Sequence, residues 1–177
     1  MRKQCFYIFM ALTFTSFHIL FAQEMQFEEY NPKSTLVVPG HIVKKAKFPF
    51  IDVHSHQRDM SKEALQSLVK DMDAMNEGVM VNLSGGSGER LLGMLQSIKT
   101  NYPNRFAVFA NVDFNGVGSE NWSEKAAKQL ETDIKNGAKG LKIFKSLGLR
   151  YNDINGKRLA IDDPRLDPIW AKCAEMG

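Results

Sequence analysis

Cysteine is scarce in this sequence of 177 residues, which contains only Cys5 and Cys173. Cys5 falls within residues 1–22, a segment predicted below to be removed. One remaining cysteine cannot form an internal disulfide, so a disulfide-stapled fold is excluded. Stability must therefore come from an ordinary apolar core, and the remaining chain is long enough to form one.

The N-terminus has the form of a secretory signal peptide. Arg2 and Lys3 precede an apolar run from Cys5 to Phe21, and Ala22 offers a small residue for cleavage. We expect residues 1–22 to be removed on export to the periplasm or the extracellular space, leaving no stable membrane span. The alternative is an uncleaved membrane anchor, because a run of about 17 residues borders on spanning length.

A strong excess of charge of either sign is also missing. The formal net charge is +3, and loss of Arg2 and Lys3 with the leader reduces it to +1. A nearly neutral protein gives no electrostatic reason to expect nucleic acid or an anionic membrane as partner. A small-molecule substrate is the expected partner, and the sequence leaves oligomerisation open.

No phosphate-binding fingerprint is present. The small-residue stretch at 84–88 lacks the Gly-Lys-Ser/Thr ending of a phosphate loop, and no glycine-rich turn follows the first predicted strand. A flexible loop between a strand and a helix is the preferred interpretation of residues 84–88. The same absence argues against a doubly wound nucleotide-binding module.

Beyond a mixed N-terminal arm at 23–47, the sequence alternates apolar runs with helical spacing. The predicted strands cover residues 50–54, 79–83, 106–112 and 140–144. The predicted helices begin at Ser61, carry Leu91 to Ile98, cover 122–136 and begin near Asp163 and Pro164. Phe50, Ile51 and Val53 give the first strand the apolar character of one covered on both faces.

Strands that alternate with helices predict a parallel α/β fold. A (β/α)8 barrel normally needs about 250 residues. We therefore expect residues 48–177 to be the first half of a TIM-like barrel, about four βα units, truncated at the C-terminus. The alternative is a complete four-stranded domain, which would leave two strand edges to cover.

The sequence Ile-Asp-Val-His-Ser-His at 51–56 carries the strongest chemical signal. Side chains alternate along a strand, so His54 and His56 face the same way, about 7 Å apart along the chain. They lie where an apolar strand gives way to polar residues, the edge at which parallel α/β proteins place their chemistry. This pattern predicts a shared metal ion, whereas a single histidine in that position is more often structural.

With this motif at the end of its first strand, the chain resembles the amidohydrolase superfamily, in particular the group that contains aminocarboxymuconate-semialdehyde decarboxylase-like enzymes. The resemblance covers residues 48–177 and implies that His54 and His56 bind a divalent metal, usually zinc. The family's later ligands, two further histidines and an aspartate, have no counterpart, since no histidine follows His56.

Lys142, in the predicted fourth strand, is similar in placement to the lysine that some family members carboxylate to bridge two metals. It could instead bind a substrate carboxylate or extend between strand and helix. Lys145 should point the opposite way on a regular strand. Lys145, Asn111 and Asp113 are weaker substrate-binding candidates, and a turn-capping role suits Asn111 and Asp113 equally. Asp52 is expected to orient backbone or neighbouring groups.

The resemblance implies a secreted metal-dependent hydrolase, in which metal-activated water attacks a C–N or ester-like bond. It implies an enzyme only for a protein with the complete ligand set. One alternative is a metal-dependent non-oxidative decarboxylase on the same fold. Another is a catalytically inactive exported binding domain.

Overall fold

The computed structural model describes residues 25–177, so the predicted signal peptide lies outside the described residues. A first unit ends at Ile42 and a second runs from Val43 to Gly177. The elements, in order, are η2 (Phe27–Glu29), β1 (Phe50–Ser55), α2 (Lys62–Met75), β2 (Glu77–Asn82), α3 (Gly88–Asn101), β3 (Phe106–Val108), α4 (Trp122–Lys135), η3 (Pro164–Leu166) and α5 (Asp167–Met176).

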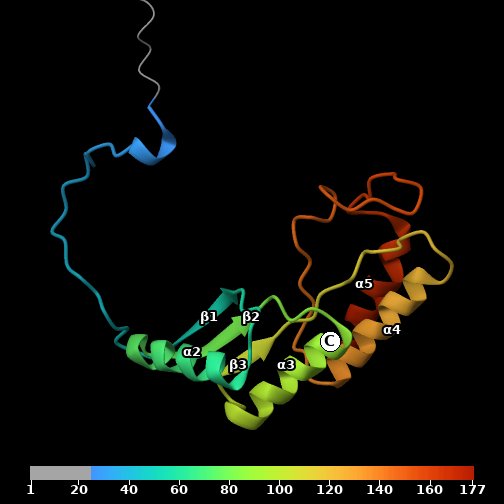
Figure 1. Cartoon of the computed structure of the whole chain (residues 1–177), viewed down its shortest axis with the longest axis horizontal. Helices are drawn as coiled ribbons and strands as arrows, with labels where there is room; N and C mark the ends of the chain where they lie inside the picture. The colour runs from blue at the N-terminus through green and yellow to red at the C-terminus, as the bar shows by residue number, and fades with distance from the viewer. Residues whose placement is uncertain (1–24) are drawn as a thin grey trace, which may run out of the picture. The chain divides into compact units, whose positions relative to one another are not determined.

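The second unit is a mixed α/β structure built on a parallel sheet. The strand order is β1-β2-β3, and each neighbouring pair is parallel. Figure 1 shows the three strands side by side, and α4 and α5 lie next to each other at the other end of the unit. A parallel pair needs a crossover, and α2 and α3 supply the two crossovers here. The predicted α/β class is therefore confirmed.

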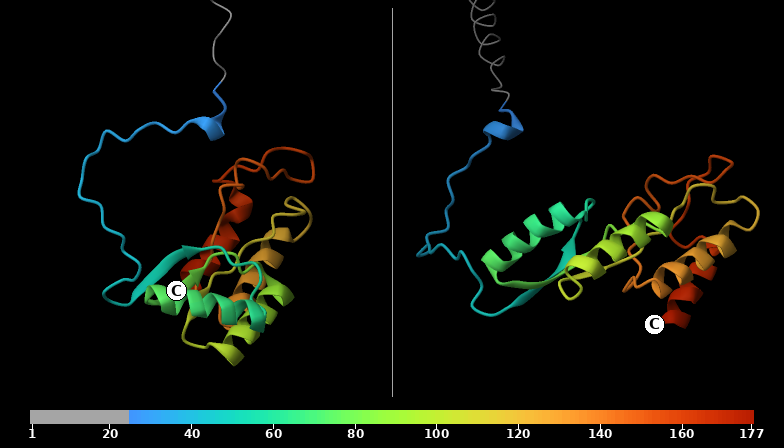
Figure 2. Two further views of the ribbon diagram at one scale, coloured as in Figure 1. Left: turned by 60° about the vertical axis from the view of Figure 1, so that its left-hand side comes forward. Right: turned by 60° about the horizontal axis from the view of Figure 1, so that its bottom comes forward.

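The helices pack in chain order, α2 against α3, α3 against α4 and α4 against α5 (Figure 2). Apolar side chains between these helices and the sheet form the core. Its fully buried members include Leu65, Met72, Leu91, Val108, Leu166 and Ile169. Removal of this apolar surface from water is the main force that holds the helices on the sheet.

Local sequence signals place the helix ends where the structure has them. The Ser61 hydroxyl caps α2 by accepting a hydrogen bond from the Ala64 amide at 3.3 Å. At the other end of α2, Asn76 takes a left-handed conformation with φ 67°, which ends the helix and turns the chain into β2. The backbone amide of Ala46 donates to Met75 O, so the start of the second unit is tied to the same corner.

The third and fourth predicted strands are shorter than expected. β3 ends at Val108, and residues 140–144 make one parallel bridge, Ala110 to Leu141. The Ala110 amide donates to Gly140 O and the Lys142 amide to Ala110 O, and these two bonds make up that single bridge. One physical reason is the Asn111 side chain, whose amide occupies backbone carbonyls that a longer strand pair would use.

β1 also differs from the prediction, because it is not covered on both faces. Ile51 is 58% exposed and Val53 is 70% exposed. β1 pairs only with β2 in the described part of the chain, so it is an edge strand, and among the described elements no helix packs extensively against it to cover its apolar side chains. The prediction that the first strand is covered on both faces is therefore wrong.

The polar segment before α5 is held by one arginine. Arg165 forms ion pairs with Asp163 at 2.7 Å and with Asp153 at 3.1 Å. Asp163 also accepts a hydrogen bond from the Arg165 amide and so caps η3, where Pro164 takes the first position.

No helix within residues 25–177 combines the length and apolar character needed to cross a membrane.

The stability of this segment depends on pH through the ionisation of Asp163. The hydrogen bonds and charge of Arg165 lower the Asp163 pKa from 3.8 to about 2. A lowered folded-state pKa gives stability that is present above pH 3.8 and is lost as the pH falls toward 2. We expect Asp163→Ala to destabilise the protein by about 1 kcal/mol at pH 7 through loss of the cap. The loss should shrink as urea unfolding is repeated from pH 4 down to pH 2.

Asp162→Asn is the matched control, because Asp162 is an exposed neighbour. It should leave the urea midpoint unchanged at every pH. A loss for Asp163→Ala that stays constant between pH 4 and pH 2 would contradict the role assigned to the ion pair.

Candidate metal site

His54 and His56 lie together where β1 ends. Their ring centroids are 5.2 Å apart in an edge-to-face arrangement, and both side chains are exposed. A register shift falls between Asp52 and Ser55, around His54, because β1 advances three residues there while β2 advances only two, from Met80 to Asn82. Such an irregularity re-aims side chains. The predicted side-by-side placement of the two imidazoles is therefore present.

Asp52 fixes the backbone at this irregularity. Its Oδ1 accepts a hydrogen bond from the His54 amide at 2.8 Å. The extra residue in β1 leaves this amide outside the regular ladder, and the carboxylate supplies the missing acceptor. Asp52 thus orients the backbone that carries His54.

A second set of contacts holds His56. Its Nδ1 lies 2.9 Å from Ser84 Oγ, at the start of the loop after β2. Among the described residues, no hydrogen bond engages His56 Nε2. Because a histidine ligand is oriented by the bond at its other nitrogen, this contact leaves Nε2 free to bind a metal.

Asn82 fixes both sides of this contact. It is fully buried, and its Oδ1 accepts hydrogen bonds from the amides of Gln57 and Ser84, each at 3.0 Å. Its Nδ2 donates to Gln57 O at 2.9 Å. One side chain therefore sets the backbone just after His56 and the backbone of Ser84, the residue that His56 contacts.

Phe144 lies beside His56 and belongs to residues 140–144, the predicted fourth strand, called here the fourth segment. Its ring centroid lies 5.6 Å from that of His56, and Lys142 Nζ lies 6.0 Å from the same Phe144 centroid. A cation at this distance from an aromatic face is attracted by it. Lys142 and His56 thus both lie beside the same aromatic ring.

The other candidates form no side-chain hydrogen bond or ion pair with the histidines among the described residues. Lys145 is exposed in the turn after the single bridge, so the alternation expected of a regular strand does not apply to it. Asn111 is engaged with backbone: its Nδ2 donates to Leu83 O and Lys142 O, and its Oδ1 accepts from the Gly86 amide. Asp113 accepts from the Asn115 amide at 2.9 Å, which is the turn-capping geometry.

Asn82, Ser84 and Phe144 were not predicted as members of the site. Asn82 offered one signal, because it is an amide at the end of an otherwise apolar strand, where a polar side chain must find partners. Ser84 and Phe144 offered none, since their contacts with His56 join residues far apart in the chain.

Two neutral imidazoles suit a divalent metal such as zinc, and the orientation of His56 fits that use. They form an incomplete set. Within residues 25–177 the structure contains no group of three or more His, Cys, Asp or Glu side chains placed to hold a metal. Comparison of the chain with family models, curated proteins and solved structures finds no match.

Proposed function

We propose that this chain carries part of the metal site of an exported metal-dependent hydrolase. The observation that supports the proposal is the contact between the His54 and His56 rings at the end of β1, with His56 Nδ1 held by Ser84. Water activated for attack on a C–N or ester-like bond is the chemistry that a divalent metal, zinc above all, supplies when bound to such a pair.

The chain's own residues have separate roles in this proposal. His54 and His56 bind the metal, Ser84 and Asn82 orient His56, and Asp52 orients His54. Lys142 lies on the same side as Phe144 and His56, where it meets either the metal region or an anionic part of a substrate. Both uses require a side chain that reaches the carboxyl end of the sheet, which is where this lysine lies.

The same proposal includes a larger fold, in which the three strands and the bridged fourth segment are the first half of a (β/α)8 barrel. The parallel order β1-β2-β3, continued by the Ala110 to Leu141 bridge, supports it. In such barrels functional side chains gather at the carboxyl ends of the strands. His54, Ser84 and Lys142 lie at three such ends.

Removal of both imidazoles is expected to abolish metal binding. Zinc titration of the chain, followed with a competing chromophoric chelator, should give one zinc per wild-type chain. The double variant His54→Ala/His56→Ala should give none, because both nitrogen ligands are lost. A hydrolytic activity of a protein with the complete ligand set should disappear together with the metal.

His41→Ala is the matched control, since it removes an exposed histidine that is not a member of the pair. It should bind zinc as the wild type does. Undiminished zinc binding by the double variant would refute the proposed metal site, whatever the behaviour of His41→Ala.

A metal-dependent non-oxidative decarboxylase is the second candidate, and Lys142 is the observation that favours it. An uncarboxylated lysine beside the Phe144 ring is a cation, suited to hold the carboxylate of a substrate. A carboxylated Lys142 would favour the hydrolase. Intact mass and release of CO2 from carboxylated substrates, measured against water-consuming cleavage, separate the two reactions.

A further inference from the structure

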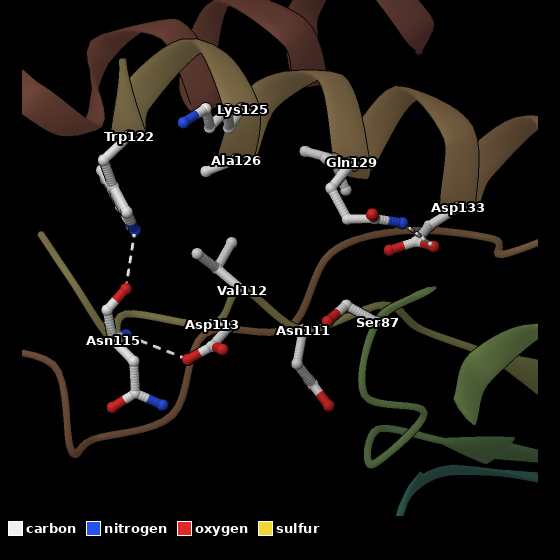
Figure 3. A pocket seen from close by; sticks show the side chains of 11 residues that line it. Ser87, Asn111, Val112, Asp113, Asn115, Trp122, Lys125, Ala126, Gln129 and Asp133 are labelled. Carbon is white, nitrogen blue, oxygen red and sulfur yellow. Dashed lines mark hydrogen bonds between the residues drawn. The ribbon is translucent and has the colours of Figure 1, made fainter. Parts of the chain in front are cut away.

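A cavity lies between α4 and the loops that follow β2 and β3. Its volume is about 250 Å³. Figure 3 shows Trp122 at one end, Gln129 and Asp133 at the other, and Val112 between them. Neither His54 nor His56 lines it, so the cavity is separate from the proposed metal site.

One end of the cavity carries an unusual carboxylate. Asp133 is only 2% exposed, and its Oδ1 accepts hydrogen bonds from the Gly88 amide at 3.0 Å and from Gln129 Nε2 at 2.9 Å. Because Gly88 is the first residue of α3, Oδ1 accepts a hydrogen bond from a free amide at the N-terminus of this helix. Oδ2 is equally buried and has no hydrogen-bond partner among the described residues.

An unpaired buried carboxylate oxygen is costly, and burial raises the Asp133 pKa accordingly. Oδ1 alone performs the structural role. Oδ2 has no donor, and a positively charged donor that entered the cavity beside Asp133 would relieve the cost most fully.

The rest of the lining indicates what kind of donor fits. Val112, Ala126 and Leu130 give the cavity apolar walls, and the Trp122 indole is fixed by donating to Asn115 O. Besides Asp133, the charged residues of the lining are Asp113 and Lys125. Two carboxylates and one ammonium group give the lining a net negative charge. A water takes about 30 Å³, so the cavity has room for more than one water and suits a ligand smaller than a typical drug.

We propose that this cavity binds a small organic ammonium ion. The ammonium group donates to Asp133 Oδ2, and the hydrocarbon part lies against Val112, Leu130 and the Trp122 ring. A carboxylate at one end and aromatic and aliphatic walls are the combination that recognises such ions, through charge-assisted hydrogen bonding and cation–π attraction.

The chain has two tryptophans, of which only Trp122 lines the cavity, so the other serves as an internal reference. We would titrate the ¹⁵N-labelled 177-residue chain with n-butylammonium chloride and follow both indole N–H signals by NMR. The Trp122 signal should move to saturation while the Trp170 signal stays fixed. The neutral alcohol n-butanol and sodium chloride should produce no saturable shift.

Asp133→Asn keeps an acceptor for the Gly88 amide and removes the charge, so it should weaken butylammonium binding about ten-fold or more. The control Asp113→Asn changes an exposed carboxylate of the same lining and should change affinity by less than about three-fold. Equal affinity for n-butanol, shifts of both indoles or of neither, or unchanged affinity in Asp133→Asn would overturn the proposal. If Asp133→Asn fails to fold, the comparison of ammonium with alcohol on the wild type decides.

Discussion

Asn82→Ala should destabilise the protein by about 3 kcal/mol or more, measured by urea unfolding at pH 7. The fully buried amide makes three hydrogen bonds to the backbone of Gln57 and Ser84. Alanine supplies none of them, so these backbone groups are left unsatisfied beside the core. The cost of stranded partners, more than the loss of the bonds themselves, makes the expected effect large.

Asn101→Ala is the matched control for this experiment. Asn101 makes one side-chain bond, to Ser97 O within its own helix. Its loss should cost less than about 1 kcal/mol, as for an ordinary hydrogen bond near a helix end. A similar small loss for Asn82→Ala would show that Asn82 does not fix the loops around His56.

Gly85→Ala is expected to cost at least about 2 kcal/mol, because there is no room for a methyl group. A Cβ there would collide with Phe109 O, and it would lie 2.7 Å from side-chain atoms of Leu91 and Val108. The carbonyl belongs to the backbone and cannot rotate away. The whole loop that begins with Ser84 would have to shift, so differential scanning calorimetry should show a clearly lower Tm.

Gly93→Ala, in α3, is expected to stabilise the protein, in contrast to Gly85→Ala. No heavy atom lies within 4 Å of a Cβ built at Gly93. Alanine has the higher helix propensity, so this variant should be more stable by about 0.5–1 kcal/mol. Equal melting temperatures for Gly85→Ala and the wild type would contradict the close packing of the loop on β3.

The helices were predictable because their determinants are local. Ser61, the apolar spacing through Met72 and the turn at Asn76 are all contained within one stretch of sequence. The helix predicted at 122–136 is present as Trp122–Lys135 for the same reason. Each of these signals acts over one or two helical turns, so no knowledge of the tertiary fold was needed.

The strands were predicted less well because pairing is not local. An apolar run such as Phe50 to Val53 shows that a strand forms, but only the tertiary packing shows whether helices cover its faces. The fourth segment has strand-like residues and forms one bridge, because Asn111 takes the Lys142 carbonyl. A contact between residues 31 positions apart leaves no pattern in either stretch.

The candidate metal site also has a local part that could be predicted and a non-local part that could not. The spacing of His54 and His56 was enough to predict that the two rings meet, since they are two residues apart where one strand ends. The partners of His56 come from other loops, Ser84 by a hydrogen bond and Phe144 by ring contact. Those partners depend on how β2 and the fourth segment are placed beside β1, which the sequence alone did not determine.

The exposed β1 strand has a practical consequence for all of these measurements. An open strand edge flanked by exposed apolar side chains, here Ile51 and Val53, is a template for strand pairing between molecules. Aggregation through this edge would hide the histidine pair and distort unfolding curves. Light scattering should therefore rise with protein concentration, and a charged substitution such as Val53→Lys should suppress the rise.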